Sequence, residues 1–561
     1  MQRIIECVPN ISEGRDMDKI HRIANVVTTV DGVKLLDIDP GKSTNRTVIT
    51  IVGNPDKVIE AAFLLIKKAS EEIDMSKHSG EHPRMGATDV CPLIPISGIS
   101  MEETAEYAKK LGSRVGKELS IPVYLYENAA TQEKRKNLAY CRSGEYEGLE
   151  KISKPEWTPD FGPNEFSGSV KKSGVTAISA RDFLVAYNVN LNSTSSRRAN
   201  AIAFDIREAG RIKKEGGVGG KVVKDENGNP VRVPGTLKSV KGIGWYIEEY
   251  GIAQLSLNLT NISITPVHIA FDEAVEKARA RGVRVTGSEL VGLIPLQAML
   301  DAADYFLTKQ QRSLGISESE KIKIAVKSLG LDDLKPFNPA ENIIEYKMID
   351  SSSKKLVDMS IKDFAEETAS ESPAPGGGSI SAYAGAIGVA LGTMVANLSA
   401  NKRGWDDQWE SFSDVAVRGQ MYLKKLLWLV DEDTNAFNKI MSAVQMPKSN
   451  DFEKNARNSA MQDATKYAIE VPFEVMKTCY ESMEVMKEMA ERGNPNSISD
   501  AGVGALCARA AVLGAFMNVK INCGDLEDKD FVADMMSKGN EIQEKTIALE
   551  KEIIDLVEAK M

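Results

Sequence analysis

The residues best suited to acid–base chemistry lie in one short stretch, HSGEHPRMGATD, which runs from His78 to Asp89. The chain of 561 residues has only four histidines, and two of them, His78 and His82, fall within this stretch. Histidine has an unperturbed pKa near neutral pH, which makes it the usual general acid or base in enzymes. Glycine and proline around the second histidine predict a shaped loop. The stretch is therefore the first candidate for a catalytic site.

Three interpretations of this stretch fit its residues. The string His-x-x-Glu-His also matches a zinc-peptidase pattern, which needs a helix with both histidines on one face. Gly80 and Pro83 both oppose such a helix. A second interpretation is a hydrogen-bonded surface loop with incidental histidines. The third is an acid–base loop, in which Pro83 restricts His82 to extended backbone and Arg84 holds a carboxylate through a bidentate pair. Spacing alone does not choose among the three.

Composition narrows the class of protein. The chain is 42% hydrophobic and 27% charged, as is ordinary for globular proteins, and its length indicates three or four domains. A net charge of −10 argues against a nucleic-acid binder. The six cysteines include no Cys-x-x-Cys pair, so free thiols in a reducing compartment fit best. The N-terminus has no apolar signal-peptide core, and we expect a cytoplasmic protein.

The first third of the chain predicts an α/β sandwich. Ser100 and Glu103 form a capping-box signature that begins a helix. The order of predicted elements is β-α-β-β-α-β, the split βαβ pattern. The loop PEWTPDFGPNEF at 155–166 is either a packed connector or the apolar wall of a ligand site. Strands are expected at 2–8, 33–39, 46–53, 93–96 and 121–127, and helices at 17–29, 55–73 and 100–118.

A second sandwich is predicted after residue 180. Its strands are expected at 183–191 and 252–261, and its helices at 193–210 and 273–282. Between them, the Gly-rich segment 216–235 contains an Asn-Gly turn signal and predicts a mobile hairpin insertion. It lacks the spacing of a phosphate-binding loop. The polar stretch 348–355 is a plausible linker.

The remainder of the chain predicts only helices. The uncharged segment 374–400 is long enough to cross a membrane, but its Ala, Gly and Ser content makes it a poor membrane span. Gly385, Gly388 and Gly392 mark a helix face that lets another backbone approach. A second small-residue helix at 501–519 suggests a tightly packed bundle core or a subunit interface.

Two motifs of the helical part carry candidate polar groups. The segment PAPGGGS at 373–379 either aims backbone N–H groups at an anion or is simply a helix start. In LVDEDTNAF at 429–437, Asp431 and Asp433 are two residues apart and must face different directions on a helix. At most one of them points inward, and a charged surface pair is the alternative.

Several of these motifs, in this order, resemble those of formimidoyltransferase-cyclodeaminases, a family of two-activity folate enzymes of histidine degradation. The resemblance covers nearly the whole chain. The insertion at 216–235 departs from the shorter versions of the family. The motifs are ECVPNISEG, DIDPGKSTNRTV, GEHPRMGATDVCP, PDFGP and GIGWYIEE for the transferase part, and PAPGGGS, LVDEDTNAF and NPNSISDAG for the cyclodeaminase part.

This resemblance implies a fold of two α/β sandwich subdomains of the βαββαβ, ferredoxin-like type, followed by an all-α helical bundle. The transferase subdomains are expected at 1–180 and 181–347, the linker at 348–355 and the cyclodeaminase domain at 356–561. Two reactions are implied. A formimino group passes from N-formimidoyl-L-glutamate to tetrahydrofolate, and the product then cyclises to 5,10-methenyltetrahydrofolate with loss of ammonia.

The resemblance also implies roles for individual residues. His82 matches the transferase acid/base and Asp433 the catalytic aspartate of the cyclodeaminase. Asp39 and Arg84 are expected to line the transferase site. The family's folate-binding segment begins in the PDFGP loop, which assigns substrate binding to Gly162, Pro163, Asn164, Glu165 and Phe166.

The implied partners are small molecules. Tetrahydrofolate, in polyglutamylated form, is the expected co-substrate, and no metal is required. A homo-oligomer built from dimers is expected, without nucleic acid and without a membrane span. Two other classes remain open, a metallohydrolase that uses the HSGEH loop and a non-catalytic oligomeric scaffold. The presence of His82, Asp39 and Asp433 argues against the scaffold.

Overall fold

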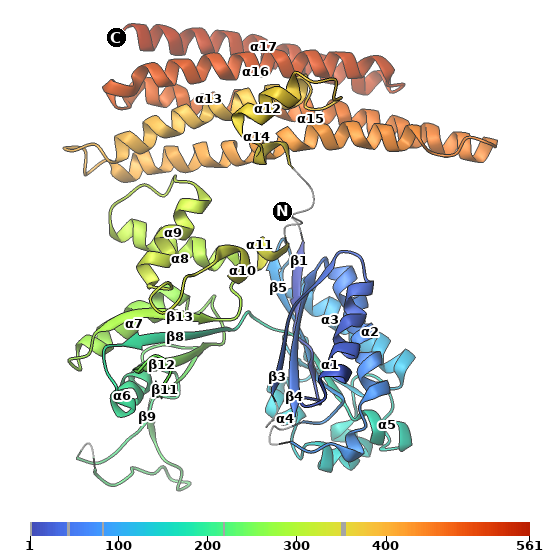
Figure 1. Cartoon of the computed structure of the whole chain (residues 1–561), viewed down its shortest axis with the longest axis vertical. Helices are drawn as coiled ribbons and strands as arrows, with labels where there is room; N and C mark the ends of the chain where they lie inside the picture. Colours follow the sequence, from blue (N-terminus) through green and yellow to red (C-terminus); the bar gives the residue numbers. More distant parts are fainter. Residues whose placement is uncertain (1–2, 42–44, 81–83, 217–218, 349–354) are drawn as a thin grey trace. The chain divides into compact units, whose positions relative to one another are not determined.

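The computed structural model describes residues 3–41, 45–80, 84–216, 219–348 and 355–561. Contacts divide the chain into two compact units. The first comprises residues 1–299 with 329–349 and is mixed α/β, whereas the second comprises residues 300–328 with 350–561 and is helical. Figure 1 shows the strands confined to the first unit. The predicted fold class, two α/β subdomains followed by an all-α part, is confirmed.

The first sheet has the strand order of a ferredoxin-like sandwich. Its antiparallel core runs β3-β4-β1-β5, as the split βαβ pattern predicts, and the short β2 continues the line of β1 between β4 and β5. Two strands that pair in parallel, β7 and then β6, extend the sheet beyond β5. The strands are β1 (Ile4–Cys7), β2 (Asn10–Ile11), β3 (Val33–Gly41), β4 (Arg46–Gly53), β5 (Thr88–Ser97), β6 (Val123–Glu127) and β7 (Thr176–Ala180).

Helices cover one face of this sheet. Side chains alternate between faces along each strand, so Ile5, Ile49 and Leu93 pack against the helices in one apolar core. Local sequence sets where these helices begin: the Asn54 side chain caps one, and Ser100 with Glu103 makes the predicted capping box of another. The helices are α1 (Met17–Ala24), α2 (Pro55–Glu72) and α3 (Met101–Leu119).

The opposite face of the sheet is only partly covered. Residues of segment 128–170 and of α5 (Gly168–Ser173) pack on the half formed by β5, β7 and β6, in a separate cluster around Tyr124, Tyr126 and Val90. The half formed by β1, β4 and β3 presents polar side chains instead. We call this half the open face, and it holds the first candidate site.

The second α/β subdomain repeats the ferredoxin-like order, β11-β12-β8-β13. Within the predicted insertion at 216–235, Lys224 bridges to Pro230 around the Asn-Gly turn, where Gly228 has a φ of +81°. The strands are β8 (Val185–Leu191), β11 (Val240–Ile247), β12 (Ile252–Leu259) and β13 (Val285–Val291), with helices α6 (Ser196–Ile206) and α7 (Val267–Arg279), and β9 (Arg211–Ile212) pairs with β10 (Arg232–Val233).

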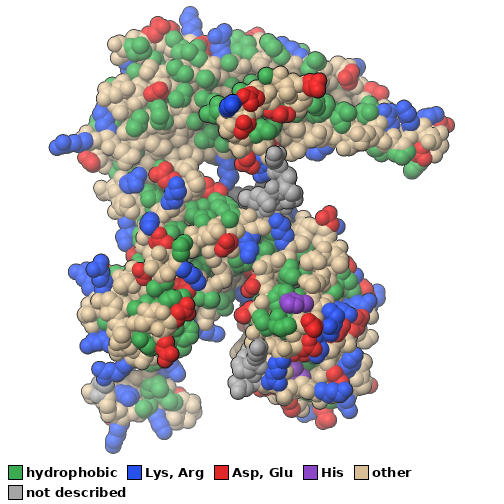
Figure 2. Space-filling model, in the orientation of Figure 1, with side chains coloured by type: hydrophobic (Ala, Val, Ile, Leu, Met, Phe, Trp, Pro, Cys, Tyr) green, Lys and Arg blue, Asp and Glu red, His purple; other side chains and the backbone are tan. Residues whose placement is uncertain are grey.

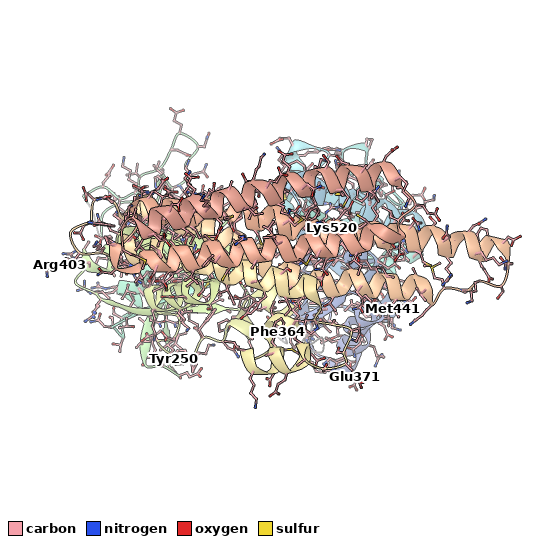
Figure 3. All side chains as sticks on the ribbon, turned by 90° about the horizontal axis from the view of Figure 1, so that it is seen from above. Tyr250, Phe364, Glu371, Arg403, Met441 and Lys520 are labelled. Carbon is pink, nitrogen blue, oxygen red and sulfur yellow. The ribbon has the colours of Figure 1, made fainter. Side chains whose placement is uncertain are left out.

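Long helices run side by side in the helical unit (Figure 3). Residues 300–328 belong to the same unit. One of the contacts that join them to the bundle is a hydrogen bond of 2.9 Å from Asn397 Nδ2 to the Gly315 carbonyl oxygen. The bundle helices are α13 (Gly377–Ala400), α14 (Trp409–Val444), α15 (Asp451–Arg492), α16 (Ile498–Asn522) and α17 (Lys529–Glu558).

Small residues set the distance between α13 and α16. A Cβ atom added at Gly388 would lie 2.7 Å from the Gly504 carbonyl oxygen, and one at Gly504 would lie 2.7 Å from the Gly388 oxygen. The two backbones therefore touch, as the glycine spacing predicts. Both helices are long and apolar enough to span a membrane, but 61% and 50% of their most apolar windows are buried in the bundle. Burial accounts for their composition.

Replacement of Gly504 by alanine should destabilise the bundle. Its added methyl meets backbone, which cannot rotate away, so we expect a loss of about 1–3 kcal/mol, the usual effect of overpacking. Gly502 on the same helix is the matched control, because its Cβ would find only ordinary contacts at 3.4 Å or more. Thermal unfolding followed by circular dichroism should show a lower midpoint for Gly504→Ala and no loss for Gly502→Ala. Equal midpoints would contradict the close approach.

Candidate active sites

A cavity of about 320 Å³ lies on the open face of the first sheet. Strand alternation places Glu6 and Val8 of the β1 region here, because their neighbour Cys7 points into the core. Arg181 approaches from the segment after β7. The cavity is lined by Glu6, Val8, Asn10, Asp37, Val48, Thr50, Arg181, Phe183, Leu184, Ala186 and Val291–Leu293.

Glu6 is the most unusual ionisable group in this cavity. Its side chain is only 5% exposed, and burial raises its pKa to about 7 although the positive charge of Arg181 opposes the shift. A carboxyl group with this pKa both gives and accepts protons near neutral pH. Sequence reasoning missed Glu6, whose only signal was a single charge within the apolar run IIEC.

Next to the cavity, two arginines share one buried carboxylate. Asp89 is fully buried, and its Oδ2 atom accepts from Arg46, at 2.5 Å, and from Arg142. Its Oδ1 accepts the backbone N–H of Met85 at 3.0 Å. The Arg46 Nε atom donates to Asn10, which lines the cavity. The cluster therefore joins the HSGEHPRMGATD loop to the open face.

The ends of this loop are held in place on both sides of residues 81–83. The His78 Nε2 atom lies 2.9 Å from the Asn45 carbonyl oxygen, and Asn45 Nδ2 donates to the Ser79 carbonyl. Burial, the largest cause, lowers the pKa of His78. Arg84 does make a bidentate pair, but with Glu147 of its own chain, at 2.9 and 2.7 Å.

His82 lies outside the described residues, and its catalytic role stays a prediction. The zinc interpretation depends on the same segment, since Glu81 is outside as well. Within the described part of the chain, no group of three or more His, Cys, Asp or Glu side chains is arranged to hold a metal ion.

The structure places the other predicted transferase residues in two different areas. Asp39 is exposed on β3 and pairs across the ladder with Val48, which lines the cavity, so it belongs to the open face. The PDFGP loop lies at the far edge of the sheet, where Phe161 forms a bridge to Val123 of β6. Gly162 follows there with a φ of +83°.

The segment Gly162–Phe166 then leads back toward the loop. The Phe166 and Tyr146 rings meet edge-on, with their centroids 6.0 Å apart. The backbone N–H of Tyr146 donates to the Arg84 carbonyl. The remaining aromatic residues are packed against protein, because Phe161 joins the core and Trp157 stacks on Tyr140 at 4.6 Å. Those two aromatics fit the packed connector, and the folate-binding role of Gly162, Pro163, Asn164, Glu165 and Phe166 stays a prediction.

A second candidate site lies at the start of α13 in the helical unit. The Asp433 carboxylate, on α14, accepts hydrogen bonds from Ser379 through its backbone N–H at 2.8 Å and its hydroxyl at 3.0 Å. Burial raises the pKa of Asp433, and the Ser379 bonds work against that shift. A Cβ at Gly378 would overlap this carboxylate. The glycine-rich helix start therefore binds a carboxylate of its own chain, the side chain of Asp433.

A small cavity of about 160 Å³ opens beside Asp433. It combines a carboxylate with amide side chains and apolar walls, which suits a flat polar ligand. Its lining residues are Pro373, Ala374, Gly376–Gly378, Asp433, Thr434, Ala436, Phe437, Ile440, Ala468, Asn518 and Asn522.

Asp431 is not an exposed surface charge, because its carboxylate is hydrogen-bonded to backbone. It is half-buried, accepts the backbone N–H of Leu356 at 2.7 Å and has a pKa raised by burial. The alternative of a charged surface pair at Asp431 and Asp433 is therefore wrong. The two residues face different directions as predicted, but each holds a different segment of backbone.

Tandem sandwiches with a polar cavity, followed by a bundle with a half-buried carboxylate at a helix start, define a two-part enzyme with one candidate site in each part. Three family models match the chain: "Formiminotransferase domain, N-terminal subdomain" at residues 4–181, "Formiminotransferase domain" at 186–349 and "Formiminotransferase-cyclodeaminase" at 360–541. The chain belongs to the formimidoyltransferase-cyclodeaminase family, as the motif resemblance indicates.

Individual relatives match the whole chain or one part of it. Formimidoyltransferase-cyclodeaminase of Mus musculus is 42% identical over 533 residues, covering 95% of this chain and 94% of the relative. Glutamate formimidoyltransferase of Streptococcus pyogenes is 41% identical over 308 residues, covering 55% of this chain and 94% of the relative. Methenyltetrahydrofolate cyclohydrolase of Methylorubrum extorquens is 34% identical over 201 residues, covering 36% and 97% respectively.

The buried Glu6 carboxyl should make stability depend on pH. Its folded pKa of about 7 exceeds the ordinary value of 4.5, so the folded state keeps a proton that the unfolded state releases. Stability should fall as pH rises from about 4.5 to about 7, by roughly 3 kcal/mol in total. Glu6→Gln removes this dependence. Its unfolding midpoint should therefore rise relative to that of the wild type between pH 5 and pH 8.

Glu71→Gln, at an exposed position on α2, is the control and should track the wild type at both pH values. If Glu6→Gln and the wild type differ by the same amount at pH 5 and pH 8, Glu6 does not titrate in this range.

Proposed function

We propose that the chain is a bifunctional folate enzyme of histidine degradation. Its α/β unit transfers the formimino group from N-formimidoyl-L-glutamate to tetrahydrofolate. Its helical unit then cyclises 5-formimidoyltetrahydrofolate to 5,10-methenyltetrahydrofolate and releases ammonia. The observation that carries the proposal is the match of each part to its own relatives, together with the separate candidate site in each part.

In the transfer step, nitrogen N5 of tetrahydrofolate attacks the formimino carbon, and the glutamate nitrogen leaves. N5 loses a proton and the leaving nitrogen gains one, so a single acid/base group near neutral pKa serves both ends. We assign this role to His82, which is two residues from Arg84. Asp39 and the open-face cavity would receive the substrates, and segment 162–166 would contact the folate.

In the cyclodeamination step, folate N10 attacks the same formimino carbon and the former imino nitrogen leaves as ammonia. N10 must lose a proton and the leaving nitrogen must gain protons. Asp433 is suited to this exchange, because burial raises its pKa and so strengthens it as a proton acceptor. Its ionised form would also stabilise an iminium-like intermediate.

A second candidate for the helical unit is hydrolysis of methenyltetrahydrofolate, because the relative from Methylorubrum extorquens carries that name and matches this part alone. The two activities differ in one product. Deamination of 5-formimidoyltetrahydrofolate yields ammonia, whereas opening of the methenyl ring by water yields none.

Several further properties belong to the same proposal. We assign residues 1–180 and 181–347 to the transferase and 356–561 to the cyclodeaminase, with a linker at 348–355. We propose a cytoplasmic location, because the six free cysteines fit a reducing compartment. No metal takes part in either step, and folates with polyglutamate tails are the natural form of the co-substrate.

A homo-oligomer built from dimers is proposed from the surface of the helical unit. Large apolar side chains remain exposed along its helices, and Figure 2 shows hydrophobic side chains on this surface. Exposed apolar area of this kind usually marks an interface. The exposed residues include Ile387, Met394 and Leu398 on α13, Val417, Met421 and Trp428 on α14, and Val503, Leu506, Met517 and Ile521 on α16.

The two activities should be separable by single substitutions. His82→Ala should lower glutamate release by about 100- to 10,000-fold, the usual contribution of an acid/base group, and leave cyclodeamination of supplied 5-formimidoyltetrahydrofolate intact. Asp433→Asn should do the reverse, so that formimidoyl-folate accumulates while glutamate release continues. Glutamate, ammonia and methenyl-folate are measured separately. Ammonia release by Asp433→Asn at wild-type rate would remove Asp433 from the mechanism.

Asp431→Asn is the matched control for the helical site. An asparagine side chain still accepts the N–H of Leu356, so folding and ammonia release should change little. A dead Asp431→Asn variant beside an active Asp433→Asn variant would reverse the assignment.

A further inference from the structure

We propose that Arg46 and Arg142, held together by Asp89, bind a carboxylate group of the amino-acid substrate next to the open-face cavity. This inference deepens the proposed transferase function and rests on it. It assigns a binding role to two arginines that the motif resemblance does not place in the site, although Arg46 falls within the motif DIDPGKSTNRTV.

The arginine pair carries more charge than its carboxylate neutralises. Two guanidinium groups meet one carboxylate, and Arg142 and Arg46 both donate to the same oxygen, Asp89 Oδ2. The other oxygen is occupied by the N–H of Met85. Among the described residues, the cluster therefore keeps one surplus positive charge. Burial disfavours such a charge, as the lowered pKa of Arg46 indicates, and a bound anion would compensate it.

Arg142 also has a donor without a partner among the described residues. The Nε atom of Arg142 is buried and makes no hydrogen bond within the described part of the chain. The Arg46 Nε atom, by contrast, donates to Asn10 at 3.0 Å. Buried donors are nearly always paired in folded proteins, so an unpaired guanidinium N–H needs a partner. A carboxylate with two oxygens matches the planar fork of arginine donors.

Both arginine side chains are partly exposed to solvent. The side chains of Arg46 and Arg142 are 12% and 16% exposed, so their edges reach solvent while Asp89 does not. Arg46 lies on the same face of β4 as Val48 and Thr50, which line the cavity. Arg46 therefore extends the polar face of the cavity toward Arg142, which it meets at Asp89.

Two carboxylate sources share this chemistry, the formimidoylglutamate donor and the glutamate tail of the folate. The donor fits better, because the formimino carbon is joined through one nitrogen to the carbon that bears the α-carboxylate. A group that binds this carboxylate must therefore lie near the acid/base. The arginine pair meets this requirement, because Asp89, which holds both arginines, also accepts the N–H of Met85, three residues after His82. A folate tail is separated from the reacting nitrogen by the entire p-aminobenzoyl group.

The main test is Arg142→Gln in the full-length protein. This variant leaves Asp89 paired with Arg46 and Met85, so each buried charge keeps a partner and the fold should persist. The KM for formimidoylglutamate should rise by roughly 10- to 100-fold, the effect of losing a hydrogen bond between charged groups. The KM for tetrahydrofolate should stay within a few-fold of the wild-type value, for both mono- and polyglutamylated forms. Arg22→Gln, an exposed ion pair on the opposite, helix-covered side, is the control and should change neither value.

Titration calorimetry with L-glutamate, the released product, tests binding without turnover. Wild-type protein should bind it and Arg142→Gln should bind at least 10-fold more weakly. This result would support the arginine site even in a protein that fails to transfer formimino groups, so failure of the proposed function is seen separately. Unchanged donor KM with a lower unfolding midpoint would show a purely structural role and overturn the proposal.

A rise confined to the KM for polyglutamylated folate would also overturn it, in favour of the folate tail. If Arg142→Gln does not fold, Arg142→Lys keeps the positive charge but loses the planar fork. The KM of this variant for formimidoylglutamate should then rise by more than twofold but less than 10-fold. A wild-type KM in the lysine variant would contradict bidentate binding.

Discussion

An aspartate that accepts a backbone N–H from a neighbouring motif, fully buried in one site and half-buried in the other, holds each candidate site together. In the α/β unit, Asp89 receives the N–H of Met85 and fixes the end of the histidine loop against the sheet. In the helical unit, Asp433 receives the N–H of Ser379 and fixes the start of α13. Backbone N–H groups cannot be titrated away, so they are durable partners for a carboxylate whose charge burial disfavours.

Much of the fold follows from local sequence. The β-branched run at 46–53 became β4 with the same bounds, Ser100 with Glu103 made a capping box, and the β-α-β-β-α-β order produced the ferredoxin-like sheet. Gly388 and Gly504 let two helices touch, because glycine has no Cβ atom to hold the backbones apart. This property can be read from the sequence without knowledge of the tertiary fold. The strands β6 and β7 extend the sheet by parallel pairing, which no local pattern specifies.

The polar clusters could not be predicted from sequence, because their partners are distant along the chain. Asp89 is 43 residues from Arg46 and 53 from Arg142. Asp431 is 75 residues from Leu356, so its helical spacing alone suggested a surface charge. Glu6 gains its raised pKa only from burial among strands that the tertiary fold assembles. The motif resemblance points to Asp433 directly. Its hydrogen bonds with Ser379 at the start of α13 are visible only in the structure.

The most direct measurement of the whole account is a time course with the wild-type protein, N-formimidoyl-L-glutamate and tetrahydrofolate. Two sites acting in sequence predict that glutamate, ammonia and methenyltetrahydrofolate form in equal final amounts. They also predict that glutamate is released only when folate is present, because the folate nitrogen is the acceptor. Glutamate release without folate would instead indicate hydrolysis, and glutamate release with folate but without ammonia would show that the helical unit does not deaminate. Either result would contradict the two-site account.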